Sequence, residues 1–143
     1  MNPILALDLG RARIGVAISD ELQLLAHPLE TILADKQAIQ RLAQIIREKK
    51  VDHVVVGIPR QMNGQIGVAA TEALRFVEKL RTILPCPVVT WDERLTTVAA
   101  HRALREAGKK TRDTRAYVDQ VAAQMILQGY LDRRQASNER GDL

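Results

Sequence analysis

Three acidic residues stand where a folded chain could use them for chemistry. Asp8 ends a short apolar run, Glu93 follows another, and Asp119 lies in the first turn of the last predicted helix. Carboxylates brought together repel one another unless a cation neutralises them. Mg²⁺ or Mn²⁺ suits oxygen ligands, and two such ions about 4 Å apart can activate water for phosphodiester cleavage. The three acids are therefore candidate metal ligands and catalytic residues.

The first elements that must position these acids are strands. Residues 4–8 and 14–19 are apolar runs joined by a basic, glycine-containing link, which predicts a hairpin. Residues 24–33 contain Pro28, and proline favours an edge strand over a central one. We therefore expect three strands at the start of the chain, with Asp8 at the end of the first.

A helix, a strand and a second helix are predicted next. Asp35 is a predicted N-cap, and apolar residues three and four positions apart predict a helix that ends near Lys50. Residues 54–59 begin with three valines, which is typical of a parallel strand buried on both faces. Residues 70–84 carry a second apolar stripe, and we expect that helix to end before Pro85.

The last part of the chain delivers the other two acids. Residues 88–91 predict a fifth strand that leads to Glu93, and residues 96–107 predict a third helix. Residues 108–115 are polar and basic and predict a mobile loop. A last helix should present Asp119 beside its apolar stripe and end near Arg134.

Composition predicts one domain. The chain has 143 residues, of which 46% are hydrophobic, so we expect one domain over residues 1–134 and a frayed polar tail over residues 135–143. Lysine and arginine total 21 against 17 acidic residues, and the net charge of +4 is compatible with a nucleic-acid partner. Cys86 is the one cysteine, which excludes an intrachain disulfide and a thiolate zinc site. Without a leader or a membrane-length apolar run, we expect a soluble cytoplasmic protein.

Three strands followed by alternating helices and strands predict an α/β fold, with a mixed five-stranded sheet flanked by helices. Asp8 and Glu93 would then meet at one edge of the sheet, because ligands collect at the carboxyl ends of parallel strands. Each acid alone also has a structural interpretation: Asp8 in a turn, Glu93 paired with Arg94, Asp119 at a helix N-terminus. The combination of the three favours a functional site.

Four sets of motifs occur in order along the chain. They are Asp8-Leu9-Gly10 with Arg13 and Gly15-Val16-Ala17; Val56-Gly57-Ile58-Pro59 with Asn63-Gly64; Asp92-Glu93-Arg94-Leu95-Thr96-Thr97; and Asp119 with Ala122-Ala123 and Ile126-Leu127. With these motifs, residues 4–132 resemble the YqgF family, also called the RuvX-like Holliday junction resolvases. That family is part of the ribonuclease H-like superfamily.

The resemblance implies a ribonuclease H-like fold and a nuclease that acts on structured RNA or DNA. It implies that Asp8, Glu93 and Asp119 bind the metal and catalyse the reaction. Two substrates compete: the 5′ end of pre-16S ribosomal RNA in ribosome biogenesis, and a four-way DNA junction in recombination and repair. Related junction resolvases carry two acids on the last helix, three residues apart, whereas this chain has Ala116 at the second position. That departure favours RNA processing.

Basic residues flank the acids in the sequence. Arg11 and Arg13 follow Asp8 and Arg94 follows Glu93, so we expect phosphate contacts from them, with solvated turns or acid partners as the alternative. The predicted loop before Asp119 adds further candidates for binding the nucleic-acid backbone, namely Lys109, Lys110 and Arg112. Aromatic residues make up 3% of the chain and do not alternate with these cations, so a base-stacking platform is not predicted.

Two other functions remain open. The hairpin after Asp8 also resembles the phosphate loop of actin-like and sugar-kinase ATPases, but those enzymes hold nucleotide between two such domains. A homodimer would be needed to supply the second. The other alternative is a non-catalytic RNA-binding protein of the same fold.

Overall fold

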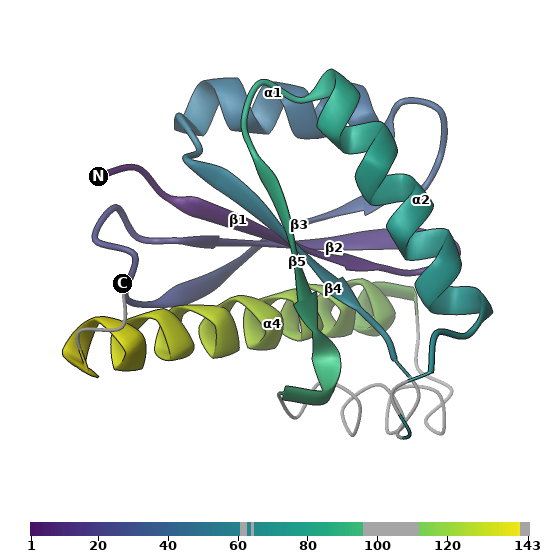
Figure 1. The fold of residues 1–143 in the computed structure, drawn as a ribbon. Helices are drawn as coiled ribbons and strands as arrows, with labels where there is room; N and C mark the ends of the chain where they lie inside the picture. The colour runs from purple at the N-terminus through teal and green to yellow at the C-terminus, as the bar shows by residue number, and fades with distance from the viewer. Residues whose placement is uncertain (61–62, 64, 96–111, 141–143) are drawn as a thin grey trace.

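The structure is a computed structural model of residues 1–143, and it describes residues 1–60, 63, 65–95 and 112–140. A single sheet lies between two layers of helices, with α1 and α2 on one face and α4 on the other (Figure 1). The strands are β1 (Ile4–Leu9), β2 (Arg13–Ser19), β3 (Ala26–Leu33), β4 (His53–Ile58) and β5 (Val88–Asp92). The helices are α1 (Ala38–Lys49), α2 (Val68–Ile83) and α4 (Arg112–Arg140), and a short 3-10 turn, η1 (Glu93–Leu95), follows β5.

The sheet confirms the predicted mixed topology. Its strand order is β3-β2-β1-β4-β5, so β1 is central. β1 pairs antiparallel with β2 and parallel with β4, and β4 pairs parallel with β5. β3 lies at the edge, as Pro28 predicted, and its register with β2 shifts between Val16 and Ala17. All six residues of β4 are buried, which agrees with its unbroken apolar pattern.

Each face of the sheet has its own hydrophobic core, because successive side chains of a strand point to opposite faces. Leu5 and Leu7 of β1 belong to the core under α1 and α2. Ile4 and Ala6 belong to the second core, where α4 contributes Ala122, Ala123, Ile126, Leu127 and Leu131. Asp8 follows in the same alternation, so it faces α4. Among the described helices, none combines the length and the apolar character needed to cross a membrane.

Three predicted boundaries are wrong. α4 begins at Arg112, inside the stretch predicted as a loop, and it continues to Arg140 instead of ending near Arg134. Residues 135–140 contain neither glycine nor proline, so nothing in the sequence stops the helix there. Asp35 is not an N-cap: α1 begins at Ala38, and the Asp35 carboxylate instead accepts a hydrogen bond from the Gln37 amide at 2.9 Å. The helix predicted over residues 96–107 lies outside the described residues.

A row of glutamines holds α4 against the edge strand β3. Gln120, Gln124 and Gln128 are four residues apart and therefore lie on one side of the helix. The Gln120 amide donates to Thr31 Oγ1 and the Gln124 amide to the Ala26 carbonyl, both at 3.0 Å. Gln128 Oε1 accepts from the Ala26 amide at 2.9 Å. These bonds fix how far along the sheet α4 lies.

A second set of contacts holds the C-terminal half of α4 to β4. The His53 ring lies between the Asp52 carboxylate at 2.6 Å and the Tyr130 hydroxyl of α4 at 2.8 Å. Tyr130 also meets Trp91 edge to face, with ring centroids 5.9 Å apart. Arg134 Cζ lies over the Tyr130 ring, 5.6 Å from its centroid. Polar and aromatic contacts therefore tie α4 to both sides of β1.

Two glycines let α4 and η1 approach the sheet closely. A Cβ on Gly15 of β2 would lie 2.0 Å from the Asp119 carbonyl oxygen of α4. A Cβ on Gly57 of β4 would lie 2.5 Å from Ile126 Cδ1 and 3.2 Å from Glu93 Cγ. Any side chain at these two positions would occupy the space where neighbouring elements now sit.

We expect Gln128→Ala to lower the free energy of unfolding by about 1–2 kcal/mol, because the Ala26 amide loses its acceptor in a partly buried place. Gln135→Ala is the matched control, since Gln135 is an exposed glutamine of the same helix and should change stability by less than about 0.5 kcal/mol. Urea denaturation measures both. Equal values for the two variants would show that the glutamine row does not hold the helix.

We expect Gly15→Ala to cost about 1–3 kcal/mol of stability, because its Cβ meets the backbone of α4, which can move only as a whole. Gly57→Ala should cost less, because its nearest contact is the flexible end of the Ile126 side chain. The same denaturation experiment compares the two. A larger loss for Gly57→Ala would contradict a rigid contact between α4 and β2.

Candidate active site

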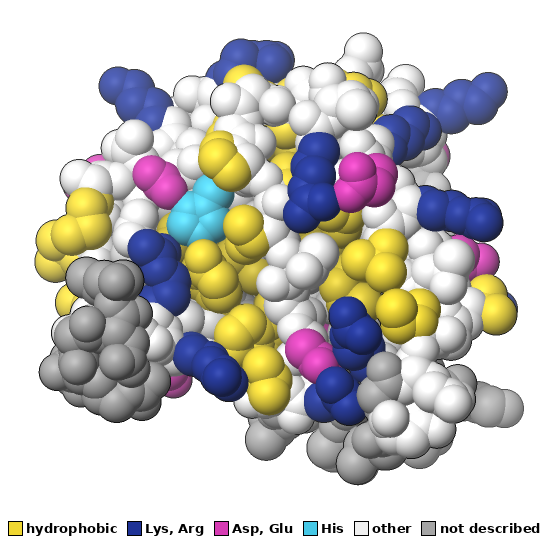
Figure 2. All heavy atoms as spheres, in the orientation of Figure 1, with side chains coloured by type: hydrophobic (Ala, Val, Ile, Leu, Met, Phe, Trp, Pro, Cys, Tyr) yellow, Lys and Arg dark blue, Asp and Glu magenta, His cyan; other side chains and the backbone are white. Residues whose placement is uncertain are grey.

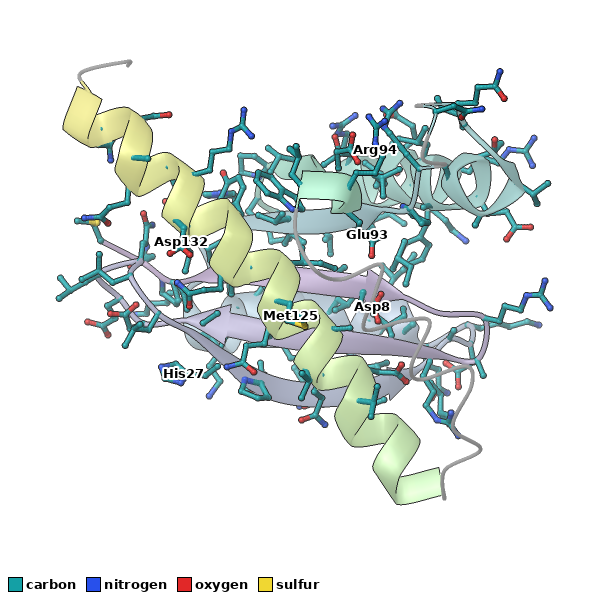
Figure 3. All side chains as sticks on the ribbon, turned by 90° about the horizontal axis from the view of Figure 1, so that it is seen from below. Asp8, His27, Glu93, Arg94, Met125 and Asp132 are labelled. Atoms are coloured by element: carbon teal, nitrogen blue, oxygen red, sulfur yellow. The ribbon has the colours of Figure 1, made fainter. Side chains whose placement is uncertain are left out.

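Asp8 lies at the centre of the candidate site. It is the fifth residue of β1, the central strand, and its side chain is on the face covered by α4. Only 1% of the residue is exposed to solvent. Figure 3 shows Asp8 on the sheet beside α4, with Glu93 on the side towards β5. The strand-end position predicted from the sequence is confirmed.

Asp119 lies close to Asp8 because it packs against Gly15, the residue of β2 that is paired with Asp8. Gly15 is paired directly with Asp8 across the β1–β2 ladder. A Cβ on Gly15 would lie 3.1 Å from the Asp119 Cβ, so the stem of Asp119 covers this glycine. Neighbouring strands are about 4.8 Å apart. The stem of Asp119 is therefore about one strand away from Asp8, and the residue is 7% exposed.

Glu93 approaches from the opposite side, over Gly57. Leu7 pairs with Val56 in the parallel ladder, so Gly57 lies one residue further along, beside Asp8. Glu93 begins η1 directly after β5, and its Cγ would lie 3.2 Å from a Cβ on Gly57. Glu93 is 2% exposed. Asp8 is thus flanked by two glycines, each covered by the stem of one of the other acids.

The structure brings the three acids into one buried region, but it does not arrange them as a complete metal cage. Within the described part of the chain, no three histidine, cysteine or acidic side chains are grouped closely enough to hold an ion. The donor chemistry nonetheless fits a hard divalent cation, because all three side chains offer carboxylate oxygens. Mg²⁺ commonly takes only one or two carboxylates and completes its shell with water and substrate phosphate.

The arginine after Glu93 is engaged by a neighbouring acid. Arg94 Nη2 lies 2.7 Å from Asp92 Oδ2, and Nε lies 3.1 Å from both carboxylate oxygens. These hydrogen bonds lower the pKa of the Asp92 carboxyl and keep it ionised. Arg60, which the sequence analysis did not single out, lies 3.8 Å from the same carboxylate. Arg94 is therefore held by its acid partner, the structural alternative considered for it.

Of the other candidate phosphate-binding side chains, the structure describes only those that follow β1. Arg11 is exposed in the turn between β1 and β2, and Arg13 is half-buried as the first residue of β2. Lys109 and Lys110 lie outside the described residues, as does the side chain of Arg112 at the start of α4. On the face turned to the viewer in Figures 1 and 2, the described lysine and arginine side chains are spread among apolar ones and do not form one large basic patch.

Gly15 and Gly57 shape the candidate site, although the sequence analysis gave them no role. Both are glycines inside otherwise apolar strands. Such a glycine weakens a strand and often marks close approach of another backbone, so the signal was present in the sequence. What the sequence does not show is which acid each glycine makes room for, because that depends on the pairing of β1 with β2 and β4.

Curated relatives match the chain over most of its length. A protein of Chloroflexus aurantiacus is 48% identical over 139 residues, covering 96% of this chain and 91% of the relative. A protein of Chloroflexus aggregans is 49% identical over 133 residues, covering 92% and 94%. Both relatives carry the name "Putative pre-16S rRNA nuclease".

A solved structure shares the fold. RuvC of Thermus thermophilus, in complex with a Holliday junction substrate, superposes with a TM-score of 0.54 at 16% identity and covers 94% of this chain and 96% of that one. The ribonuclease H-like α/β fold is thereby confirmed. The sequence profile described as "RuvX: Holliday junction resolvase" matches residues 2–133. Together with relatives that are nearly half identical along almost the whole chain, this match shows that the chain belongs to the RuvX family.

Proposed function

We propose that this protein is a metal-dependent nuclease that cleaves phosphodiester bonds in structured nucleic acid, and that it processes the 5′ end of pre-16S ribosomal RNA. The observation that carries the proposal is the placement of Glu93 and Asp119 over the two glycines beside Asp8. Membership of the RuvX family and the names of the relatives support it.

The chain's own residues supply binding and orientation. Asp8 and one of the two flanking acids would hold Mg²⁺ or Mn²⁺ through their carboxylate oxygens, together with water and a substrate phosphate. When bound, such an ion supplies a reactive water at neutral pH and stabilises charge on the leaving oxygen. The rigid backbone of β1 holds Asp8 in place, while α4 and η1 set the distance of the other two acids from it.

RNA is the preferred substrate for two reasons. The relatives named after pre-16S ribosomal RNA match nearly the whole chain. The chain also has Ala116 where a second acid would stand three residues before Asp119 on the last helix. The four-way DNA junction is the second candidate, favoured by the family description and by the ligand of the RuvC structure. Cleavage of a symmetric junction would require a homodimer with two sites.

The proposed function also implies a cellular compartment and roles for the basic side chains near the acids. Precursor ribosomal RNA is a cytoplasmic substrate in bacteria, so we place the protein in the cytoplasm. Arg11 lies in the β1–β2 turn and Arg13 is the first residue of β2, and we infer that both bind phosphates next to the cleaved bond. Lys109, Lys110 and Arg112 would bind the backbone further from it. Arg94 would also bind a substrate phosphate, which would then replace the Asp92 carboxylate as its partner.

Substitution of the acids should abolish cleavage while the fold persists. Asp8→Asn and Asp119→Asn each remove a charge without changing shape, and we expect a loss greater than the roughly 10- to 100-fold typical of outer-shell partners. The assay incubates wild type and variants with a ribosomal RNA precursor and with a four-way DNA junction, in Mg²⁺, in Mn²⁺ and in EDTA. Cleavage should require metal and should be faster on the RNA.

Asp132→Asn is the matched control for these variants. Asp132 is an exposed acid of α4, distant from Asp8 along the helix (Figure 3), and it accepts a hydrogen bond only from Gln128 among the bonds described. Its substitution should leave cleavage unchanged. Cleavage that survives both Asp8→Asn and Asp119→Asn would refute the site. Metal-dependent cutting of the junction alone would transfer the proposal to DNA.

Metal binding can be measured without catalysis. Mg²⁺ or Mn²⁺ that binds the native state should stabilise it, by about 2.7 kcal/mol at 100 times the dissociation constant. We therefore expect the melting temperature of the wild-type protein to rise by several degrees over a Mn²⁺ titration. Asp8→Asn should lose most of this rise, and Asp132→Asn should retain it. An equal rise in all three proteins would place the ion elsewhere.

A further inference from the structure

A cleft opens on the α2 side of the sheet, next to the candidate active site. Its volume is about 890 Å³, which lies within the range of roughly 300–1,000 Å³ found for small-molecule sites. Of its lining residues, Arg11 alone has a role in the function proposed above. Its walls come from the end of β1, the β1–β2 turn, the residues that follow β3 and β4, and the N-terminal part of α2. The lining residues that matter below are Leu9, Arg11, Pro59, Ala69, Glu72 and Phe76.

The lining combines apolar walls with two charged groups. Aliphatic side chains and one aromatic ring, Phe76, form most of the surface, and Phe76 is the only phenylalanine of the chain. Arg11 and Glu72 are exposed to solvent and lie on the lining. A mostly apolar cleft with a few polar groups suits a flat, partly polar ligand. A cation beside it suits a ligand that also carries phosphate.

The cleft and the acids are joined by two stretches of backbone. Asp8 faces α4, and Leu9, the next residue, faces the cleft because strand side chains alternate. On β4, Gly57 lies beside Asp8, and Pro59, two residues later, lines the cleft. A polynucleotide whose phosphate lies at Asp8 therefore needs to cross only the end of β1 to bring a neighbouring nucleotide to the cleft.

We propose that this cleft binds one unpaired nucleobase of the nucleic-acid substrate, adjacent to the bond that is cut. The proposal rests on the nuclease function proposed above and adds to it a preference for an unpaired nucleotide beside the cleavage site. Phe76 offers the aromatic surface for stacking, Arg11 contacts the phosphate of the same nucleotide, and Glu72 accepts a hydrogen bond from a base amino group. A base held in a duplex is stacked on both sides and cannot enter.

An abasic scan tests the proposal. The probes are short RNA hairpins with a single-stranded 5′ extension, each with one base removed at a successive position. Affinity is measured by fluorescence anisotropy in the Asp8→Asn protein, in which the substrate stays intact, and cleavage is measured in parallel with wild type. Base–aromatic stacking changes affinity by about tenfold or more. We expect a loss of this size at one position only, next to the mapped cut.

Variants then assign the effect to the cleft. Ala69→Met places a longer side chain on the cleft wall at an exposed helical position. With the cleft filled, removal of the base at the sensitive position should no longer lower the affinity. Thr71→Met is the matched control, because Thr71 is exposed on the same turn of α2 and is not part of the lining. It should keep the wild-type profile. Phe76→Leu retains an apolar side chain, removes the ring and should reduce the loss as well.

The possible results distinguish a failure of the cleft proposal from a failure of the nuclease proposal. Cleavage by wild type with a flat abasic profile, or a profile unchanged in Ala69→Met, refutes the cleft proposal and leaves the nuclease intact. A position-specific profile without cleavage supports the cleft and refutes the nuclease. AMP or ATP, added at a concentration near the dissociation constant of the hairpin, should not displace the hairpin from the protein. Displacement by either would identify the cleft as a site for free nucleotide and overturn the proposal.

Discussion

The close contact between α4 and β2 at Gly15 is the constraint on which the site depends. The Asp119 carbonyl lies where a Cβ would stand, so the helix approaches the sheet as closely as backbone allows. Protein interiors are too densely packed to absorb a displacement at such a contact. The distance between Asp8 and Asp119 is therefore set by backbone on both sides, which is more rigid than side-chain packing alone.

Contacts far from the acids maintain this approach. The glutamine row ties α4 to β3, and the Asp52–His53–Tyr130 hydrogen bonds tie it to β4. Because a helix is stiff along its length, fixing it at the Gln128 and Tyr130 end also fixes Asp119 at the other end. Residues that never meet substrate thus contribute to the geometry of the site, as supporting residues do in preorganised sites generally.

The sequence predicted the parts of the site that follow from local pattern. A short apolar run over residues 4–7 places Asp8 at the end of a strand, and a stripe of apolar residues places Asp119 beside the buried side of its helix. The roles of Gly15 and Gly57 could not be predicted, because they depend on strand register. The ends of α4 were also missed, since a polar segment can be solvated equally well as loop or helix. The engagement of Arg94 by Asp92 requires side-chain positions that no spacing reveals.

The order of the elements along the chain has a consequence for protein synthesis. β1, which carries Asp8, comes first and becomes the centre of the sheet, whereas α4, which carries Asp119, is made after all five strands. A domain generally folds as a unit during synthesis. The face of the sheet that holds Asp8 therefore has no covering helix until α4 has left the ribosome, and the three acids can meet only then.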